Sequence, residues 1–173
     1  CHIGSQITSI KTFEKVFNKM KKAINFFHSN NLKINHLDLG GGFGISYKSE
    51  KDHLNLNSLA SLINKIFPAP SFKISFEPGR FLVARSGFLI TKILTNKLNG
   101  NINYLVTDAG MHTLLRPAMY NAFHRIIPFN KKGAKTKYTI AGPICESSDI
   151  LAKNIFLPKQ KKDSLLIICD VGA

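Results

Sequence analysis

A run of glycines directly after a strand pattern constrains the fold of this chain most strongly. Residues 34–39 have the apolar content of a buried strand and lead into Gly40, Gly41 and Gly42. Because glycine has no β-carbon, such a run leaves backbone N–H groups able to close around a phosphate or another small anion. A flexible loop or tight turn is the alternative, since glycine motifs alone are weak evidence.

Helix and strand patterns alternate through the first half of the chain. Apolar residues recur at helical spacing over residues 11–28 and again over residues 56–67. Residues 34–39 and 72–76 read as strands, and we interpret residues 1–6 as the end of another strand. This alternation predicts parallel strands joined by helices, as in a β/α barrel or a doubly wound sheet.

Polar residues follow all three predicted strands. His2 and Ser5 end the first, the glycine run ends the second, and residues 77–80 end the third. The carboxyl ends of parallel strands are where such folds place their ligands. The sequence therefore predicts an anion-binding site formed by these three segments.

From about Gly87 the sequence changes to short β-like runs separated by turns rich in Asn, Gly and Lys. These runs are Phe88 to Leu94, Ile102 to Val106, Tyr138 to Ile140, Ile155 to Leu157 and Leu165 to Cys169. Residues 114–123 fit a short helix or a loop equally well. We predict a mostly antiparallel β domain, with the domain boundary near Arg85.

The net charge of +14 first suggests nucleic-acid binding. However, the lysines are dispersed, and the clusters at 131–132 and 159–162 lack interleaved aromatic residues. We interpret the charge as a compositional bias that attracts anionic ligands mildly. No apolar run is long enough to span a bilayer.

Three cysteines without CxxC spacing argue for a reducing compartment rather than a disulfide framework. The six histidines are scattered, so their spacing indicates no zinc site. Strand patterns occur at both ends of the chain, which predicts that it is a piece of a longer protein.

Five short motifs follow one another along the chain. They are His2-Ile3-Gly4-Ser5-Gln6, Gly40-Gly41-Gly42-Phe43-Gly44-Ile45, Glu77-Pro78-Gly79-Arg80, Asp108-Ala109-Gly110 with Arg116-Pro117-Ala118-Met119-Tyr120, and Cys145-Glu146-Ser147-Ser148-Asp149. Together they resemble the diaminopimelate decarboxylase family, which belongs to the pyridoxal-phosphate-dependent decarboxylases with an alanine-racemase-like barrel. The resemblance covers nearly the whole chain. It implies an α/β fold in which residues 1–85 are the C-terminal part of a pyridoxal-phosphate-binding, TIM-like β/α barrel and residues 86–173 are part of a C-terminal β domain.

The resemblance implies that one group of residues binds pyridoxal 5'-phosphate. This group comprises His2, Ser5, Gly40, Gly41, Gly42, Glu77, Pro78, Gly79 and Arg80. His2 resembles the histidine that stacks on the pyridine ring, and Ser5 resembles the serine near the phosphate. Glu77 would face the pyridine nitrogen and keep it protonated, so that the ring accepts electrons when CO₂ departs. An ordinary ion pair between Glu77 and Arg80 is the alternative.

The resemblance implies that a second group binds the substrate. Arg80 and Arg116 would grip the distal carboxylate with Tyr120, because a guanidinium matches a carboxylate bidentately. Glu146 would contact the distal ammonium, and Cys145 would be the catalytic proton donor, contributed from a partner subunit. The alternatives are that Arg116 caps a loop, that Tyr120 is a core residue, and that Cys145 is a buried cysteine.

The family's Schiff-base lysine and a tyrosine-bearing motif lie outside residues 1–173. We therefore expect this polypeptide alone to bind the cofactor weakly and to turn over no substrate. The resemblance implies that the parent protein decarboxylates meso-2,6-diaminopimelate to L-lysine and CO₂, the last step of lysine biosynthesis. It also implies a cytoplasmic homodimer with an active site shared across the interface. We expect no metal, nucleic-acid or membrane partner.

Three alternatives stay open. An arginine or ornithine decarboxylase would need no grip on a distal carboxylate, so Arg116 and Tyr120 argue against it. A non-catalytic homologue that binds pyridoxal phosphate would need no proton donor, so Cys145 argues against that function. A basic nucleic-acid-binding protein would show steeply salt-dependent binding.

Overall fold

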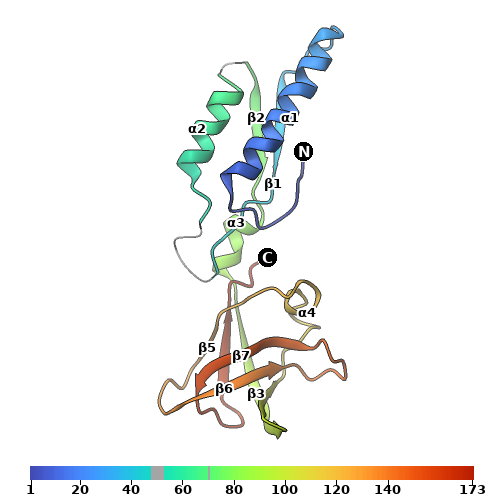
Figure 1. The fold of residues 1–173 in the computed structure, drawn as a ribbon. Coiled ribbons are helices and arrows are strands. Elements are labelled where there is room, and N and C mark those ends of the chain that lie inside the picture. The colour runs from blue at the N-terminus through green and yellow to red at the C-terminus, as the bar shows by residue number, and fades with distance from the viewer. Residues whose placement is uncertain (48–52, 70) are drawn as a thin grey trace. The chain divides into compact units, whose positions relative to one another are not determined.

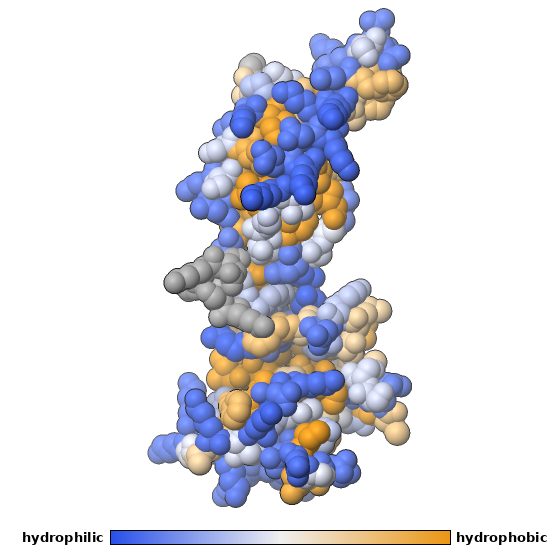
Figure 2. Space-filling model, in the orientation of Figure 1, coloured by the Kyte–Doolittle hydropathy of each residue, from blue (hydrophilic) through white to orange (hydrophobic). Residues whose placement is uncertain are grey.

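The computed structural model describes residues 1–47, 53–69 and 71–173, and this part of the chain divides into two units (Figure 1). The first unit is Cys1–Val83 and the second is Ala84–Ala173. Each unit has its own cluster of buried apolar residues. Hydrophilic side chains cover much of the visible surface of both units (Figure 2). The lysines are dispersed along the sequence.

The first unit has a two-stranded parallel sheet and two long helices. Its elements are α1 (Ile10–Ser29), β1 (His36–Gly41), α2 (Leu56–Ile66), β2 (Lys73–Glu77) and the short α3 (Arg80–Val83). Both long helices were predicted from their periodicity to within one residue at each end. The α2 helix begins where the Asn55 side chain accepts a hydrogen bond from the Ser58 N–H at 2.9 Å.

The helices pack on one face of this sheet. Phe13 and Phe17 of α1 are buried against the same core as Leu37 and Leu39 of β1. Alternate residues of β1 therefore point to the other face, because strand side chains alternate with a period of two. The core therefore lies between the sheet and the helices.

Residues 1–6 do not form the predicted strand. Gly4 has a φ of +123° and Gln6 a φ of +62°, and neither angle is compatible with an extended strand. Ile7 instead forms an isolated parallel bridge with Phe43. The segment therefore still lies beside the chain that follows β1, although it is irregular.

The second unit is a six-stranded mixed sheet. Its strands are β3 (Phe88–Asn99), β4 (Ile102–Thr107), β5 (Ile126–Pro128), β6 (Lys135–Ala141), β7 (Ile150–Pro158) and β8 (Leu165–Cys169). They follow the spatial order β5-β8-β3-β4-β6-β7. The edge strands β5 and β7 contact each other, so the sheet is nearly closed.

The predicted antiparallel arrangement holds for every neighbouring pair except one. The strands β4 and β6 are parallel, because the chain between them passes through α4 (Arg116–Tyr120) and β5 before it returns to the sheet. Side chains of Ile93, Leu105, Ile140 and Leu166 are completely buried inside the sheet. The short helix α4 thus lies on the connection that makes the sheet mixed.

Candidate functional site

The glycine run packs directly against the backbone of two other segments. At each of its three glycines a β-carbon would lie closer than 3.0 Å to a carbonyl oxygen, that of Cys1 for Gly40, of Glu77 for Gly41 and of Gly4 for Gly42. Real β-carbons do not approach other atoms this closely, so only glycine fits. The structure therefore brings together the three polar segments that the sequence placed at strand ends.

One of these glycines uses its N–H within the chain. The Gly40 N–H donates to the Asp38 carboxylate at 2.7 Å, which forms a local turn. The Asp38 carbonyl also accepts a hydrogen bond from the Cys1 nitrogen at 2.7 Å. The backbone of the run is therefore engaged within the chain, since Gly41 is also paired with Glu77 in the strand ladder.

Gln6 links the first segment to the other two. Its side-chain amide donates to the Ile45 carbonyl, and its Oε1 accepts the Ile45 N–H at 3.3 Å. The Nη1 of Arg80 donates to the same Oε1 at 3.5 Å. Gln6 lies in the first of the five motifs, but the sequence alone indicated no role for it.

The Arg80 guanidinium supplies a further donor at this end of β2. Its Nε is buried and, among the residues that the structure describes, has no hydrogen-bond partner. A buried donor without a partner is costly, and an arginine pairs well with a phosphate or carboxylate. The structure records no ion pair between Arg80 and Glu77, both of which it describes, so that alternative is not supported.

The other predicted residues of this segment are accessible. His2, Ser5 and Glu77 are exposed, at the same end of the sheet as the glycine run. With the Arg80 guanidinium, these side chains supply a donor for an anion and a carboxylate for a cationic nitrogen, which are the two kinds of polar group that a phosphorylated pyridine ring presents.

One face of the β1–β2 sheet carries polar side chains next to the glycine run. Asp38 pairs in register with Ser75, and the His36 Nε2 lies 2.9 Å from the Ser75 Oγ. These side chains lie on the face opposite the helices. Sequence reasoning missed them, although the alternation of polar and apolar residues in both strands was a usable signal.

Arg116 is held by a histidine in the second unit. The Arg116 Nη1 lies 3.1 Å from the His124 Nε2, and the His124 Nδ1 lies 3.0 Å from the Cys169 carbonyl oxygen. The carbonyl can only accept, so Nδ1 carries the proton and Nε2 accepts from the guanidinium. His124 is buried and was not predicted.

The remaining predicted residues of this unit are exposed. Tyr120 is 70% exposed, so it is not a core residue, and Cys145 is exposed, so it is not a buried cysteine. Glu146 accepts a hydrogen bond from the Ser147 N–H at 3.0 Å. Their side chains are therefore available to a ligand or to another protein chain.

Asp108, in the fourth motif, has a perturbed pKa. The Thr91 hydroxyl donates to its carboxylate at 2.5 Å and the Lys92 N–H donates at 2.9 Å. These two hydrogen bonds favour the charged form and lower the pKa of Asp108 below its ordinary value of 3.8. The carboxylate ties the start of β3 to the end of β4.

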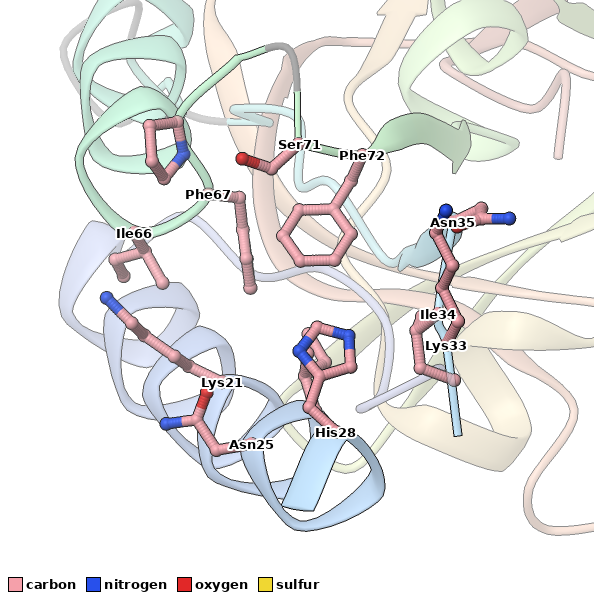
Figure 3. A pocket seen from close by; sticks show the side chains of 12 residues that line it. Lys21, Asn25, His28, Lys33, Ile34, Asn35, Ile66, Phe67, Ser71 and Phe72 are labelled. Atoms are coloured by element: carbon pink, nitrogen blue, oxygen red, sulfur yellow. The ribbon is translucent and has the colours of Figure 1, made fainter. Parts of the chain in front are cut away.

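A cavity of about 370 Å³ lies in the first unit, away from the glycine run (Figure 3). It is lined by the last turns of α1 and α2 and by the residues that precede β1 and β2. The His28 and Phe72 rings stack there with centroids 6.4 Å apart. Because the cavity lies at the amino ends of both strands, it is not part of the predicted site.

No group of three or more His, Cys, Asp or Glu side chains in the described part of the chain could hold a metal ion. Within the same residues, no helix combines the length and the apolar character that crossing a membrane requires.

A family model described as "Pyridoxal-dependent decarboxylase, C-terminal sheet domain" matches residues 14–172. The chain is 36% identical, over its whole length, to a diaminopimelate decarboxylase of Aquifex aeolicus and spans 41% of that relative. A diaminopimelate decarboxylase of Archaeoglobus fulgidus is also 36% identical and is covered to 43%. The chain thus spans about two fifths of the curated relatives it matches.

Solved structures share this fold. A Helicobacter pylori diaminopimelate decarboxylase complexed with L-lysine is 34% identical to this chain and superposes with a TM-score of 0.91. The match covers 99% of this chain and 43% of the Helicobacter pylori chain. A Vibrio vulnificus lysine/ornithine decarboxylase complexed with cadaverine has a TM-score of 0.88 at 23% identity, over 99% of this chain and 47% of its own. At that identity the second likeness concerns the fold alone.

Proposed function

We propose that this chain, which belongs to the pyridoxal-dependent decarboxylases, is part of an enzyme that removes CO₂ from meso-2,6-diaminopimelate and forms L-lysine. The relatives named above, which are diaminopimelate decarboxylases, support the choice of substrate. One observation carries the proposal for this chain itself. It is the close backbone packing of residues 1–6, the glycine run and Glu77 at one end of β1 and β2.

Residues 1–85 would be the C-terminal part of a TIM-like β/α barrel. The parallel pair β1 and β2, with α2 on the connection and both long helices on one face, supports this architecture. Residues 86–173 would be part of the C-terminal sheet domain. In the whole protein, further strands would extend the sheet of the first unit.

The cofactor of this enzyme would be pyridoxal 5'-phosphate. Arg80, with Ser5 and the backbone of the glycine run, would hold the phosphate, and the unpartnered Arg80 Nε supports this assignment. His2 would lie against the ring, and Glu77 would keep the ring nitrogen protonated. Pro78 and Gly79 would set the turn between Glu77 and Arg80. When bound, the cofactor supplies an electron sink for the bond to the leaving carboxylate.

The substrate would be held mainly by the second unit. Arg116, oriented by His124, would bind the distal carboxylate together with Tyr120. Glu146 would contact the distal ammonium. The Cys145 thiol would hold the proton that the α-carbon receives after CO₂ has left.

The enzyme would act as a homodimer in the cytoplasm. Cys145 and Glu146 are exposed in this chain, which supports their contribution to the site of a partner subunit. A symmetric dimer would then contain two equivalent shared sites.

Substrate profiling of the full-length protein tests the proposed function. With pyridoxal phosphate, we expect CO₂ release from meso-diaminopimelate and none from L-ornithine or L-arginine. Turnover of ornithine or arginine alone would refute the substrate. Cofactor binding without any turnover would indicate a non-catalytic homologue.

The variant Arg116→Lys probes the carboxylate grip in the same assay. Lysine keeps the charge but lacks the bidentate fork, so we expect KM for meso-diaminopimelate to rise by about tenfold. Lys137→Arg, a charge-conserving change on the exposed part of β6, is the control and should leave KM unchanged.

A further inference from the structure

Asp149 is a buried carboxylate at the end of the motif that contains Cys145 and Glu146. It is only 2% exposed. Its Oδ1 accepts the Met111 N–H at 2.6 Å, and its Oδ2 accepts the Ile144 N–H at 2.9 Å. A buried charge is costly unless it is hydrogen-bonded, so these two N–H groups account for its burial.

Two glycines let the backbone approach this carboxylate. A β-carbon at Gly110 or at Gly142 would lie closer than 3.0 Å to the Asp149 carboxylate oxygens. Gly110 belongs to the loop after β4, and Gly142 follows β6. One carboxylate therefore joins the loop after β4 to the loop between β6 and β7.

The loop between β6 and β7 is also closed by its own backbone. The Gly142 N–H donates to the Asp149 carbonyl at 2.9 Å, and the Asp149 N–H donates to the Glu146 carbonyl at 3.1 Å. Cys145 and Glu146 thus lie in the chain between two anchored points. One is Ile144, whose N–H donates to the Asp149 side chain, and the other is Asp149 itself. Removing the carboxylate leaves the Ile144 end of this segment without its anchor.

We infer that Asp149 is a positioning residue, which holds the loop of residues 142–149 and thereby fixes the Cys145 thiol and the Glu146 carboxylate for the reaction. The catalytic consequence rests on the function proposed above. Both Asp149 oxygens bind backbone N–H groups, so the carboxylate acts through the loop and not on the substrate.

The test compares Asp149→Ala, Asp149→Asn and Asp163→Asn in the full-length protein with pyridoxal phosphate. Asparagine keeps one acceptor oxygen and alanine keeps none. Asp163 is exposed and lies 3.9 Å from the Lys92 Nζ, so its variant removes the same charge without touching the loop.

We expect kcat/KM for meso-diaminopimelate to fall by about 100-fold in Asp149→Ala and by about tenfold in Asp149→Asn, since small misplacements of reacting groups cost this much. The fall should be divided between a lower kcat, from Cys145, and a higher KM, from Glu146. Cofactor absorbance should not change, because the proposed cofactor residues lie in the other unit. Asp163→Asn should behave as wild type.

Two structural readouts accompany the kinetics. Amide hydrogen exchange at Met111 and Ile144 should become faster in both Asp149 variants. Cys169 is 1% exposed and reports on the sheet, so it should stay protected from alkylation. If Cys169 becomes reactive in Asp149→Ala, that variant has unfolded, and Asp149→Asn decides the question.

The positioning role would be overturned if the Asp149 variants exchanged the Met111 and Ile144 amides at the wild-type rate. It would also be overturned if these amides exchanged faster while kcat and KM stayed at their wild-type values. If the unmodified enzyme does not decarboxylate meso-diaminopimelate, the proposed function fails instead. Exchange at the two amides would then still show whether Asp149 holds the loop.

Discussion

Replacing Gly42 with alanine should disrupt the proposed cofactor site through the backbone. A β-carbon there would lie 2.0 Å from the Gly4 carbonyl oxygen, whereas real β-carbons essentially never approach within 3.0 Å. The two segments would have to separate by about 1 Å (3.0 minus 2.0) to relieve the clash. Gly42 also has a φ of +79°, which alanine adopts with difficulty.

Two costs contribute to the expected loss of stability. The left-handed backbone costs alanine about 1–2 kcal/mol, and overpacking typically adds about 1–3 kcal/mol. Gly100→Ala separates them, because Gly100 has a φ of +56° but open space around its β-carbon position. The Gly42 variant should therefore be the less stable of the two by about 1–3 kcal/mol.

Denaturant unfolding and spectrophotometric titration with pyridoxal phosphate, both on the full-length protein, measure this difference. We expect Gly42→Ala to bind the cofactor on the order of tenfold or more weakly, since the segment that carries Ser5 is displaced. Gly100→Ala should bind it normally. Equal stability and equal cofactor affinity in the two variants would refute the role of close backbone packing.

Three further predictions concern the second unit. Hydrogen bonds lower the pKa of Asp108, so the stability that its carboxylate contributes is complete above pH 3.8 and is lost as the pH falls through the lower pKa of the folded protein. The free energies of unfolding of wild type and Asp108→Asn should therefore differ at neutral pH and converge in strong acid. A difference that stays constant with pH would contradict this. His124→Gln removes the ring that orients Arg116, so KM for meso-diaminopimelate should rise on the order of tenfold with little change in kcat, and an unchanged KM would count against it. Cys145→Ser should lower kcat by about 100-fold while cofactor absorbance persists, and a wild-type kcat would exclude the thiol as proton donor.

Local patterns were sufficient for the longer helices and strands. The apolar periodicity located α1 and α2, and the short β-like runs located five strands of the second unit. The strand β5 was missed because it has only three residues and ends at Pro128. The segment of residues 1–6 was wrongly taken as a strand, since the positive φ of Gln6 has no signature in the sequence.

The supporting residues of the site could not be predicted in the same way. Met111 and Asp149 are 38 residues apart, and His124 and Cys169 are 45 apart. Such pairs arise only when the sheet has closed, so no local pattern indicates them. The roles assigned to exposed residues such as Tyr120 and Cys145 come from motif resemblance and stay predictions.

The polar face of β1 and β2 has a consequence for the interior of the proposed barrel. Layers of branched aliphatic side chains usually fill that space. In this chain the corresponding face presents His36, Asp38 and Ser75. A barrel closed around them would enclose ordered water molecules that hydrogen-bond to these polar side chains. The interior next to the cofactor site would then contain water instead of packed apolar side chains.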